Sequence, residues 1–161
     1  MDTETARSIA YYSHHGRRDR LGELQIEHVT RVVAAVPPPA RTTAWLHDVL
    51  EHSDTPSAAL REGGMTAVEE EALDLLTRRD DEPFELHMLR IAHAPGPAGD
   101  VARAIKIADL DDHLAQSAQD PLRWDLPPYA WARRHLSAAM DVDDAVAEVE
   151  RPLPVRVPSS R

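Results

Sequence analysis

Cysteine is absent from this chain of 161 residues, which excludes disulfides and thiolate metal sites and fits a reducing compartment. No apolar run approaches the length of a membrane span. The acidic start MDTETARS lacks the basic residues and apolar core of a signal peptide. These absences predict a soluble, cytoplasmic protein with no membrane partner.

Positive charge is also scarce, because 28 Asp and Glu residues outnumber 18 Lys and Arg residues and give a formal net charge of -10. A chain with this charge repels polyanions, so a nucleic acid polymer is not an expected partner. A small anionic substrate is still compatible with the charge if a local basic patch and a cation receive it. The composition leaves the oligomeric state open and allows a homo-oligomer.

Strand patterns are missing as well, because apolar residues recur at three- and four-residue spacing without sustained alternation. At 161 residues and 42% hydrophobic, the chain fits one domain with a real core. We therefore predict an all-α fold, a compact bundle of about seven or eight helices. The domain covers residues 1–145, and a proline-rich tail covers residues 146–161.

Glycine, proline and capping residues indicate where these helices begin and end. Thr3 or Thr5 is expected to cap the first helix, and Thr66 and Glu69 have the spacing of a capping box. The expected helices cover residues 3–15, 24–36, 38–52 and 56–62, a stretch after Thr66 that holds Leu73, Leu75 and Leu76, and residues 83–92, 98–115 and 128–140.

Four residues with metal-binding side chains lie inside these expected helices: His28, His47, Asp48 and Asp109. Two imidazoles and two carboxylates without a thiolate suit a borderline-to-hard divalent ion, and such a site typically leaves positions for water and a phosphate oxygen. A single histidine on a helix is more often structural, so the prediction depends on the combination. We expect a buried metal site that ties three helices together.

Further polar residues share the helix faces of these ligands. Glu51 lies one turn after His47, where a carboxylate can orient or deprotonate a water molecule. Lys106 and His113 lie a turn before and a turn after Asp109. Each has an ordinary alternative, since a charged or imidazole side chain on a helix is commonly a solvated or structural group.

Several sequence segments resemble one known family. In order they are HHG at 14–16, DRLGE at 19–23, IEH at 26–28, AWLHDVLE at 44–51, LLTRRD at 75–80 and AIKIADL at 104–110. Together they resemble the HD-domain metal phosphohydrolases, and within these the hydrolase domain of the RelA/SpoT guanosine polyphosphate enzymes and their small single-domain relatives. The resemblance runs from about residue 6 to residue 140 and implies an all-α HD-domain bundle around a buried metal site.

The resemblance implies that His28, His47, Asp48 and Asp109 hold one divalent ion, usually manganese in this family, although other transition metals are compatible. Glu51 matches the carboxylate that manages the attacking water. These assignments follow from the matched positions in the family's motifs.

The resemblance also implies residues around the substrate. His52 stands where the family commonly has aspartate, and we assign it with Glu51 to catalysis. The leaving oxygen would be protonated by either His52 or His113. His113 stands where the family's asparagine contacts substrate, and Arg20 matches a basic position near the substrate phosphates. With Lys106, these two make up the predicted substrate-binding set. Leu24-Gln25 replaces the family's Pro-Tyr, a change we interpret as structural.

The function expected from the resemblance is hydrolysis of a small anionic nucleotide, in particular removal of the 3′-pyrophosphate from a guanosine polyphosphate. Two alternatives stay open: an HD-type phosphatase acting on nucleoside monophosphates, and a degenerate HD domain that binds nucleotide without turnover. A site for two ions is a third variant, because His52, His87, His93 and His113 are additional imidazoles.

Overall fold

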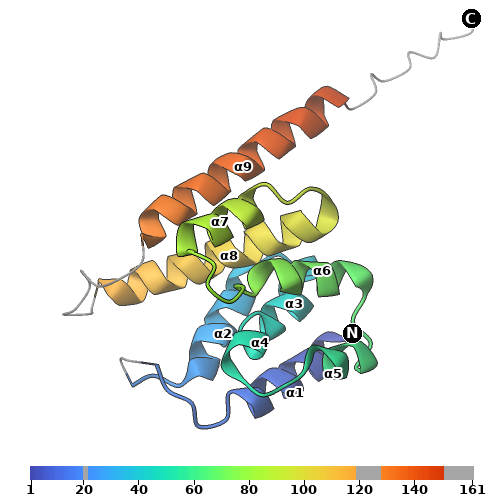
Figure 1. Cartoon of the computed structure of the whole chain (residues 1–161), viewed down its shortest axis with the longest axis vertical. Coiled ribbons are helices and arrows are strands. Elements are labelled where there is room, and N and C mark those ends of the chain that lie inside the picture. Colours follow the sequence, from blue (N-terminus) through green and yellow to red (C-terminus); the bar gives the residue numbers. More distant parts are fainter. Residues whose placement is uncertain (20–21, 119–127, 151–161) are drawn as a thin grey trace, which may run out of the picture.

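The computed structural model describes residues 1–19, 22–118 and 128–150, with side chains through residue 140 in the last segment. Within these ranges the regular structure is helical, with one isolated bridge between Arg18 and Leu24. The predicted all-α fold is therefore confirmed (Figure 1). The elements are α1 (Thr3–Ser13), α2 (Gln25–Ala35), the 3-10 helix η1 (Pro38–Ala40), α3 (Arg41–Leu46), α4 (Val49–His52), α5 (Ser57–Glu62), α6 (Ala67–Leu76), α7 (Phe84–Ala92), α8 (Gly96–Ser117) and α9 (Tyr129–Glu150).

Helices α3 and α4 form one nearly continuous helix that is interrupted at two residues. His47 and Asp48, between them, keep right-handed helical backbone angles, with φ −57° and ψ −32° at His47 and φ −100° and ψ −6° at Asp48. Counted together, α3 and α4 leave eight α-helices in the described ranges, within the predicted seven or eight. The interruption falls on the pair that the sequence predicts as metal ligands.

The helix caps confirm one prediction and correct another. The capping box of α6 is present: Thr66 Oγ1 accepts from the Glu69 N–H at 3.3 Å, and Glu69 Oε2 accepts from the Thr66 N–H at 2.7 Å. The predicted cap of α1 by Thr3 or Thr5 is wrong, because Asp2 precedes the helix and its carboxylate accepts from the Thr5 N–H at 2.8 Å. Aspartate is a stronger N-cap than threonine, which accounts for the earlier start.

The last helix is longer than predicted, since it ends at Glu150 and not at Met140. No glycine or proline follows Met140 until Pro152, whose ring disfavours helical angles at the residue before it. The helix therefore continues to that point, and its C-terminal part extends away from the other helices (Figure 1). The tail predicted from residue 146 is corrected accordingly, and residues 151–161 lie outside the described part of the chain.

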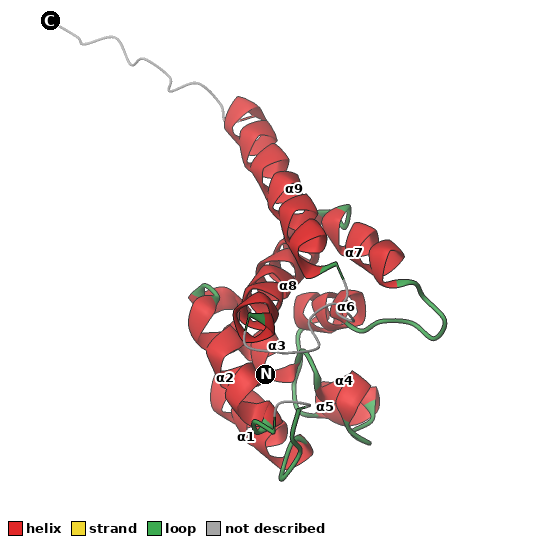
Figure 2. Ribbon diagram, turned by 90° about the vertical axis from the view of Figure 1, so that its left-hand side faces the viewer, coloured by secondary structure: helices red, strands yellow, loops and turns green. Residues whose placement is uncertain are grey.

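Helix α8 lies at the centre of the bundle, with α2, α6, α7 and α9 packed around it, while α1 packs on α3 (Figure 1, Figure 2). Ile105 and Leu110 of α8 are fully buried, and each such side chain contributes about 1.5–3 kcal/mol of hydrophobic stabilisation. This packing carries Asp109, next to Leu110, into the interior. Among the described residues, no helix is both long and apolar enough to cross a membrane.

Candidate metal centre

The structure brings the four predicted ligands together from three regions of the fold. His28 comes from α2, His47 and Asp48 from the junction of α3 and α4, and Asp109 from α8. The Nε2 atom of His28 lies 3.3 Å from Asp109 Oδ1 and 3.9 Å from Asp48 Oδ2. His47 Nε2 lies 3.3 Å from Asp48 Oδ1. Residues separated by up to 81 positions in the sequence therefore lie together around His28, in two overlapping groups that share this imidazole.

Hydrogen bonds orient both histidine rings toward this point. His47 Nδ1 donates to the carbonyl oxygen of Ala44 at 2.8 Å, and His28 Nδ1 donates to Asp112 Oδ2 at 2.8 Å. Each ring therefore presents Nε2 to the cluster. Both Nε2 atoms are buried and have no hydrogen-bond partner among the described residues. An unsatisfied buried polar atom costs about 1–3 kcal/mol, so two such atoms among carboxylates fit a cation.

The electrostatics of the cluster also favour a cation. Burial lowers the pKa of His28, but the carboxylates of Asp109 and Asp112 outweigh it and raise this pKa to about 10. Burial raises the pKa of Asp109, but the charge of Lys106 outweighs it and holds this pKa well below its ordinary range. Asp109 is therefore a carboxylate, and a divalent ion that displaces the His28 proton would satisfy the same negative charges. The residues present fit a metal ion.

Two residues that sequence reasoning did not assign to the site hold the ligands in place. Asp112, which binds His28, also accepts from Arg31 Nε at 2.6 Å. Gln25 Nε2 donates to Asp48 Oδ2 at 2.7 Å, so Gln25 directly contacts a candidate ligand. Partners of this kind fix the orientation of metal ligands. The signal for Asp112 was its position three residues after Asp109, on the same helix face.

A cavity of about 300 Å³ opens beside the cluster. Its lining includes two of the four ligands and most of the residues predicted to act on substrate: Asp48, Asp109, Glu51, His52, Lys106 and His113. The carboxylate of Glu51 is anchored, because Oε1 accepts the backbone N–H of Arg78. The exception is Arg20, which lies outside the described residues.

Two of the residues predicted to bind substrate, Lys106 and His113, directly contact the candidate ligand Asp109. Lys106 Nζ forms an ion pair with Asp109 Oδ2 at 2.7 Å, so its charge supports a ligand as well as facing the cavity. His113 Nε2 lies 3.1 Å from Asp109 Oδ1, and its ring stacks on His28 with centroids 4.9 Å apart. His28, Asp109 and His113 form one group able to hold an ion, and His28, His47 and Asp48 form another. The two groups share His28.

The additional histidines divide into two kinds. His87 lines the cavity, but its Nε2 is hydrogen-bonded to the Leu75 carbonyl at 2.9 Å, and burial lowers its pKa. His93 is exposed at the C-terminal end of α7 and does not line this cavity. His93 therefore lies apart from His52, His87 and His113, which all line the metal-side cavity.

Sequence reasoning also missed two aromatic residues and an arginine in the cavity wall. Phe84 and Tyr129 pack edge to face with ring centroids 6.0 Å apart, and Tyr129 stacks on His113 at 5.1 Å. Arg78 adds a cation to the lining. The position of Arg78 in the LLTRRD segment could have indicated a role in the site. No local sequence pattern indicates that Tyr129 lies beside α8.

Comparison with known proteins does not assign the chain to a family. A scan against protein-family models found no match, and a search of curated proteins found no sufficiently similar sequence. The geometry of the site therefore carries the functional argument.

Proposed function

We propose that this protein is a metal-dependent phosphohydrolase of the HD type, acting on a guanosine polyphosphate or a related nucleotide. The observation that carries the proposal is the pair of buried, unpartnered Nε2 atoms on His28 and His47, directed at Asp48 and Asp109 beside a polar cavity. Nitrogen and oxygen donors without sulfur suit Mn²⁺ and similar ions, which is the choice that the sequence resemblance implies. The cytoplasmic location expected from composition stays a prediction.

His28, His47, Asp48 and Asp109 would hold a divalent ion, which when bound would lower the pKa of a water molecule and polarise a phosphate oxygen. The remaining steps belong to side chains around the cavity. Because Glu51 Oε1 is held by the Arg78 N–H, we assign Oε2 as the atom that accepts the proton of the attacking water. His52 lines the same cavity and is exposed, so it can exchange protons with solvent and protonate the leaving oxygen.

Local charge supports an anionic substrate despite the overall charge of -10. Arg78 and Lys106 line the cavity beside the ligands, and Arg17 and Arg18 line a smaller neighbouring cavity of about 230 Å³. Cations clustered along concave walls attract small anions even on an acidic protein. We therefore propose that phosphate groups occupy the cavity at the metal centre.

The anchored Glu51 favours turnover over binding alone, because a site that only binds nucleotide has no use for an oriented general base. The test is anion-exchange analysis of products after the Mn²⁺-loaded protein is incubated with guanosine tetraphosphate. Pyrophosphate and GDP are expected, with neither product formed by Asp48→Ala. Release of orthophosphate would instead favour a phosphatase acting on monophosphates.

Glu51→Gln provides the matched control, since this variant keeps every proposed metal ligand. It should bind Mn²⁺ like the wild type while turnover falls at least 100-fold, the scale of a lost general base. Intact substrate after incubation with the metal-loaded wild type would overturn the proposed reaction. Full activity in Glu51→Gln would overturn the assigned role of the carboxylate.

A further inference from the structure

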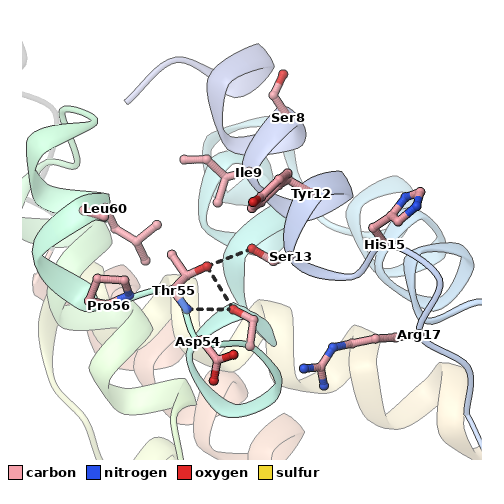
Figure 3. A pocket seen from close by; sticks show the side chains of 12 residues that line it. Ser8, Ile9, Tyr12, Ser13, His15, Arg17, Asp54, Thr55, Pro56 and Leu60 are labelled. Carbon is pink, nitrogen blue, oxygen red and sulfur yellow. Dashed lines mark hydrogen bonds between the residues drawn. The ribbon is translucent and has the colours of Figure 1, made fainter.

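A second cavity of about 1120 Å³, which we call the large pocket, has none of the four candidate metal ligands in its lining. It is formed by α1, by the segment that joins α4 to α5, and by α5 (Figure 3). The metal-side cavity, at about 300 Å³, is at the lower end of the usual range for ligand pockets, roughly 300–1,000 Å³. The metal-side cavity has room for phosphate groups, so the nucleoside of a nucleotide substrate needs a second site.

One side of the large pocket is apolar. Ile9 of α1, Pro56 and Leu60 of α5 line this side, and Leu60 also belongs to the buried core. Tyr12 stands at the same pocket with 86% of its surface exposed, which is unusual for an aromatic side chain. A flat ring bound here would remove from water part of its own apolar surface and part of the exposed surface of Tyr12.

The opposite side is polar. Ser13 and Ser53 each share a hydrogen bond with Thr55, with oxygen atoms 3.0 Å apart in both cases. In Figure 3, Ser13 and Thr55 of this hydroxyl row lie between Leu60 on one side and Arg17 on the other. Hydroxyl groups both donate and accept, so the row can exchange hydrogen bonds with the hydroxyls of a sugar. Arg17 supplies a cation at the edge.

The large pocket and the metal centre are linked by residues that line more than one cavity. Gln25 and His52 line both the metal-side cavity and the small cavity of about 230 Å³. Arg17 lines both that small cavity and the large pocket. In addition, His52 lines the metal-side cavity and Ser53 lines the large pocket, and these consecutive residues have Cα atoms about 3.8 Å apart.

We propose that the large pocket binds the nucleoside of the substrate whose phosphates lie at the metal centre. The base packs against Ile9, Leu60 and Tyr12, the ribose meets the hydroxyl row, and Arg17 lies beside the phosphates that run toward His52. This inference rests on the proposed function and adds the site that selects a nucleotide over a simple phosphate. None of the residues proposed to contact the base or the ribose lies in the segments that resemble the phosphohydrolase family, and Arg17 falls between two of those segments.

The test is a pair of equivalent substitutions on α5. Ala59 and Ala58 are both exposed, but only Ala59 lines the pocket. Ala59→Phe therefore fills the proposed nucleoside site, and Ala58→Phe is the matched control at the same cost in helix propensity. Both are made in the Glu51→Gln background, which is expected to keep the nucleotide intact. Calorimetry then measures binding of guanosine tetraphosphate and of inorganic pyrophosphate to the Mn²⁺-loaded proteins.

We expect Ala59→Phe to weaken the binding of guanosine tetraphosphate about tenfold or more, with pyrophosphate affinity within about twofold. Ala58→Phe should change neither. Tyr12→Ala, at a position too exposed to affect folding, should weaken tetraphosphate binding about 3- to 10-fold by removing the ring that the base contacts.

Three results would overturn the inference. One is tetraphosphate affinity unchanged by Ala59→Phe, and another is equal loss for both probes. The third is a stoichiometry of two nucleotides per chain, which would make the pocket a separate effector site. Failure of the proposed function is distinguished by a separate observation, the lack of Mn²⁺-dependent turnover in the unsubstituted protein.

Discussion

Asp112 offers the most direct test of how the metal centre is built. Its carboxylate accepts from His28 Nδ1 at 2.8 Å and from Arg31 Nε at 2.6 Å. Burial raises the pKa of Asp112, but these two hydrogen bonds outweigh it and lower the pKa to about 2, so the group is ionised at neutral pH. The charge both fixes the tautomer of His28 and makes Nε2 a stronger ligand. Asp112→Asn removes the charge and keeps the shape.

The expected loss follows from what each substitution leaves behind. Asparagine at position 112 can still accept one hydrogen bond from His28, although its amide group meets the donors of Arg31. Replacing such a supporting carboxylate usually lowers metal affinity 10- to 100-fold, or about 1.4–2.7 kcal/mol. We expect about tenfold for Asp112→Asn and a value nearer 100-fold for Asp112→Ala, which also loses the hydrogen bond.

The assay is isothermal titration calorimetry with Mn²⁺ at fixed pH and salt. Asp111→Asn is the matched control, because Asp111 is the neighbouring carboxylate on α8, is half exposed and pairs with Arg133 at 3.0 Å. This control removes the same charge without touching His28. Equal affinities for Asp112→Asn, Asp111→Asn and the wild type would refute the reasoning. A folded Asp112→Ala protein with wild-type affinity would do so as well.

Three other measurements test the site and the fold. Burial lowers the pKa of His28, but the neighbouring carboxylates outweigh it and raise this pKa to about 10. Because only the neutral ring binds a metal ion, Mn²⁺ binding near pH 7 should release about one proton. Calorimetry in buffers of different ionisation enthalpy measures this, and an affinity that does not rise with pH would contradict it. Hydrogen bonds from Arg90 lower the pKa of Glu82 from 4.5 to about 2, so the pair stabilises the fold above pH 4.5 and loses this contribution as the pH falls through 2. Between pH 4.5 and 2, the free energy of unfolding of Glu82→Gln, measured by chemical denaturation, should change less with pH than that of the wild type. Identical pH dependence in the two proteins would contradict a stabilising role for the Glu82–Arg90 pair. Arg103 is buried and donates to the Ala94 carbonyl at 2.6 Å, so Arg103→Met should destabilise by about 3 kcal/mol and lower Tm by about 10 °C; an unaltered melting curve would count against this.

The local sequence predicted the helices well because their signals are local. The capping box at Thr66 and Glu69 and the proline that precedes α7 mark helix starts without reference to the rest of the fold. The two clear misses were local as well. The N-cap of α1 is Asp2 and not Thr3 or Thr5. Helix α9 continues beyond the predicted end at Met140, because the residues that follow include no glycine or proline up to Glu150.

The candidate ligands were also readable from the sequence, because their residue types suit a divalent ion and the segments around them resemble the motifs of one family. His28, His47, Asp48 and Asp109 were selected without any knowledge of distance, and the structure brings them together. Roles that depend on direction were harder to predict. The position of His113 on the Asp109 face was visible, but its contact with Asp109 Oδ1 depends on how α8 packs against α2 and α9.

Packing alone decided the remaining features. Gln25 reaches Asp48, and Asp112 reaches His28, across helix interfaces that no local periodicity specifies. The pocket between α1 and α5 likewise joins segments that are more than 40 residues apart. The physical reason is that a 3.6-residue repeat states which face of a helix is buried, but not which other helix covers it. Residue types and the resemblance of the motif segments therefore predicted the candidate ligands, and helix packing determined their supporting contacts and the adjoining pocket.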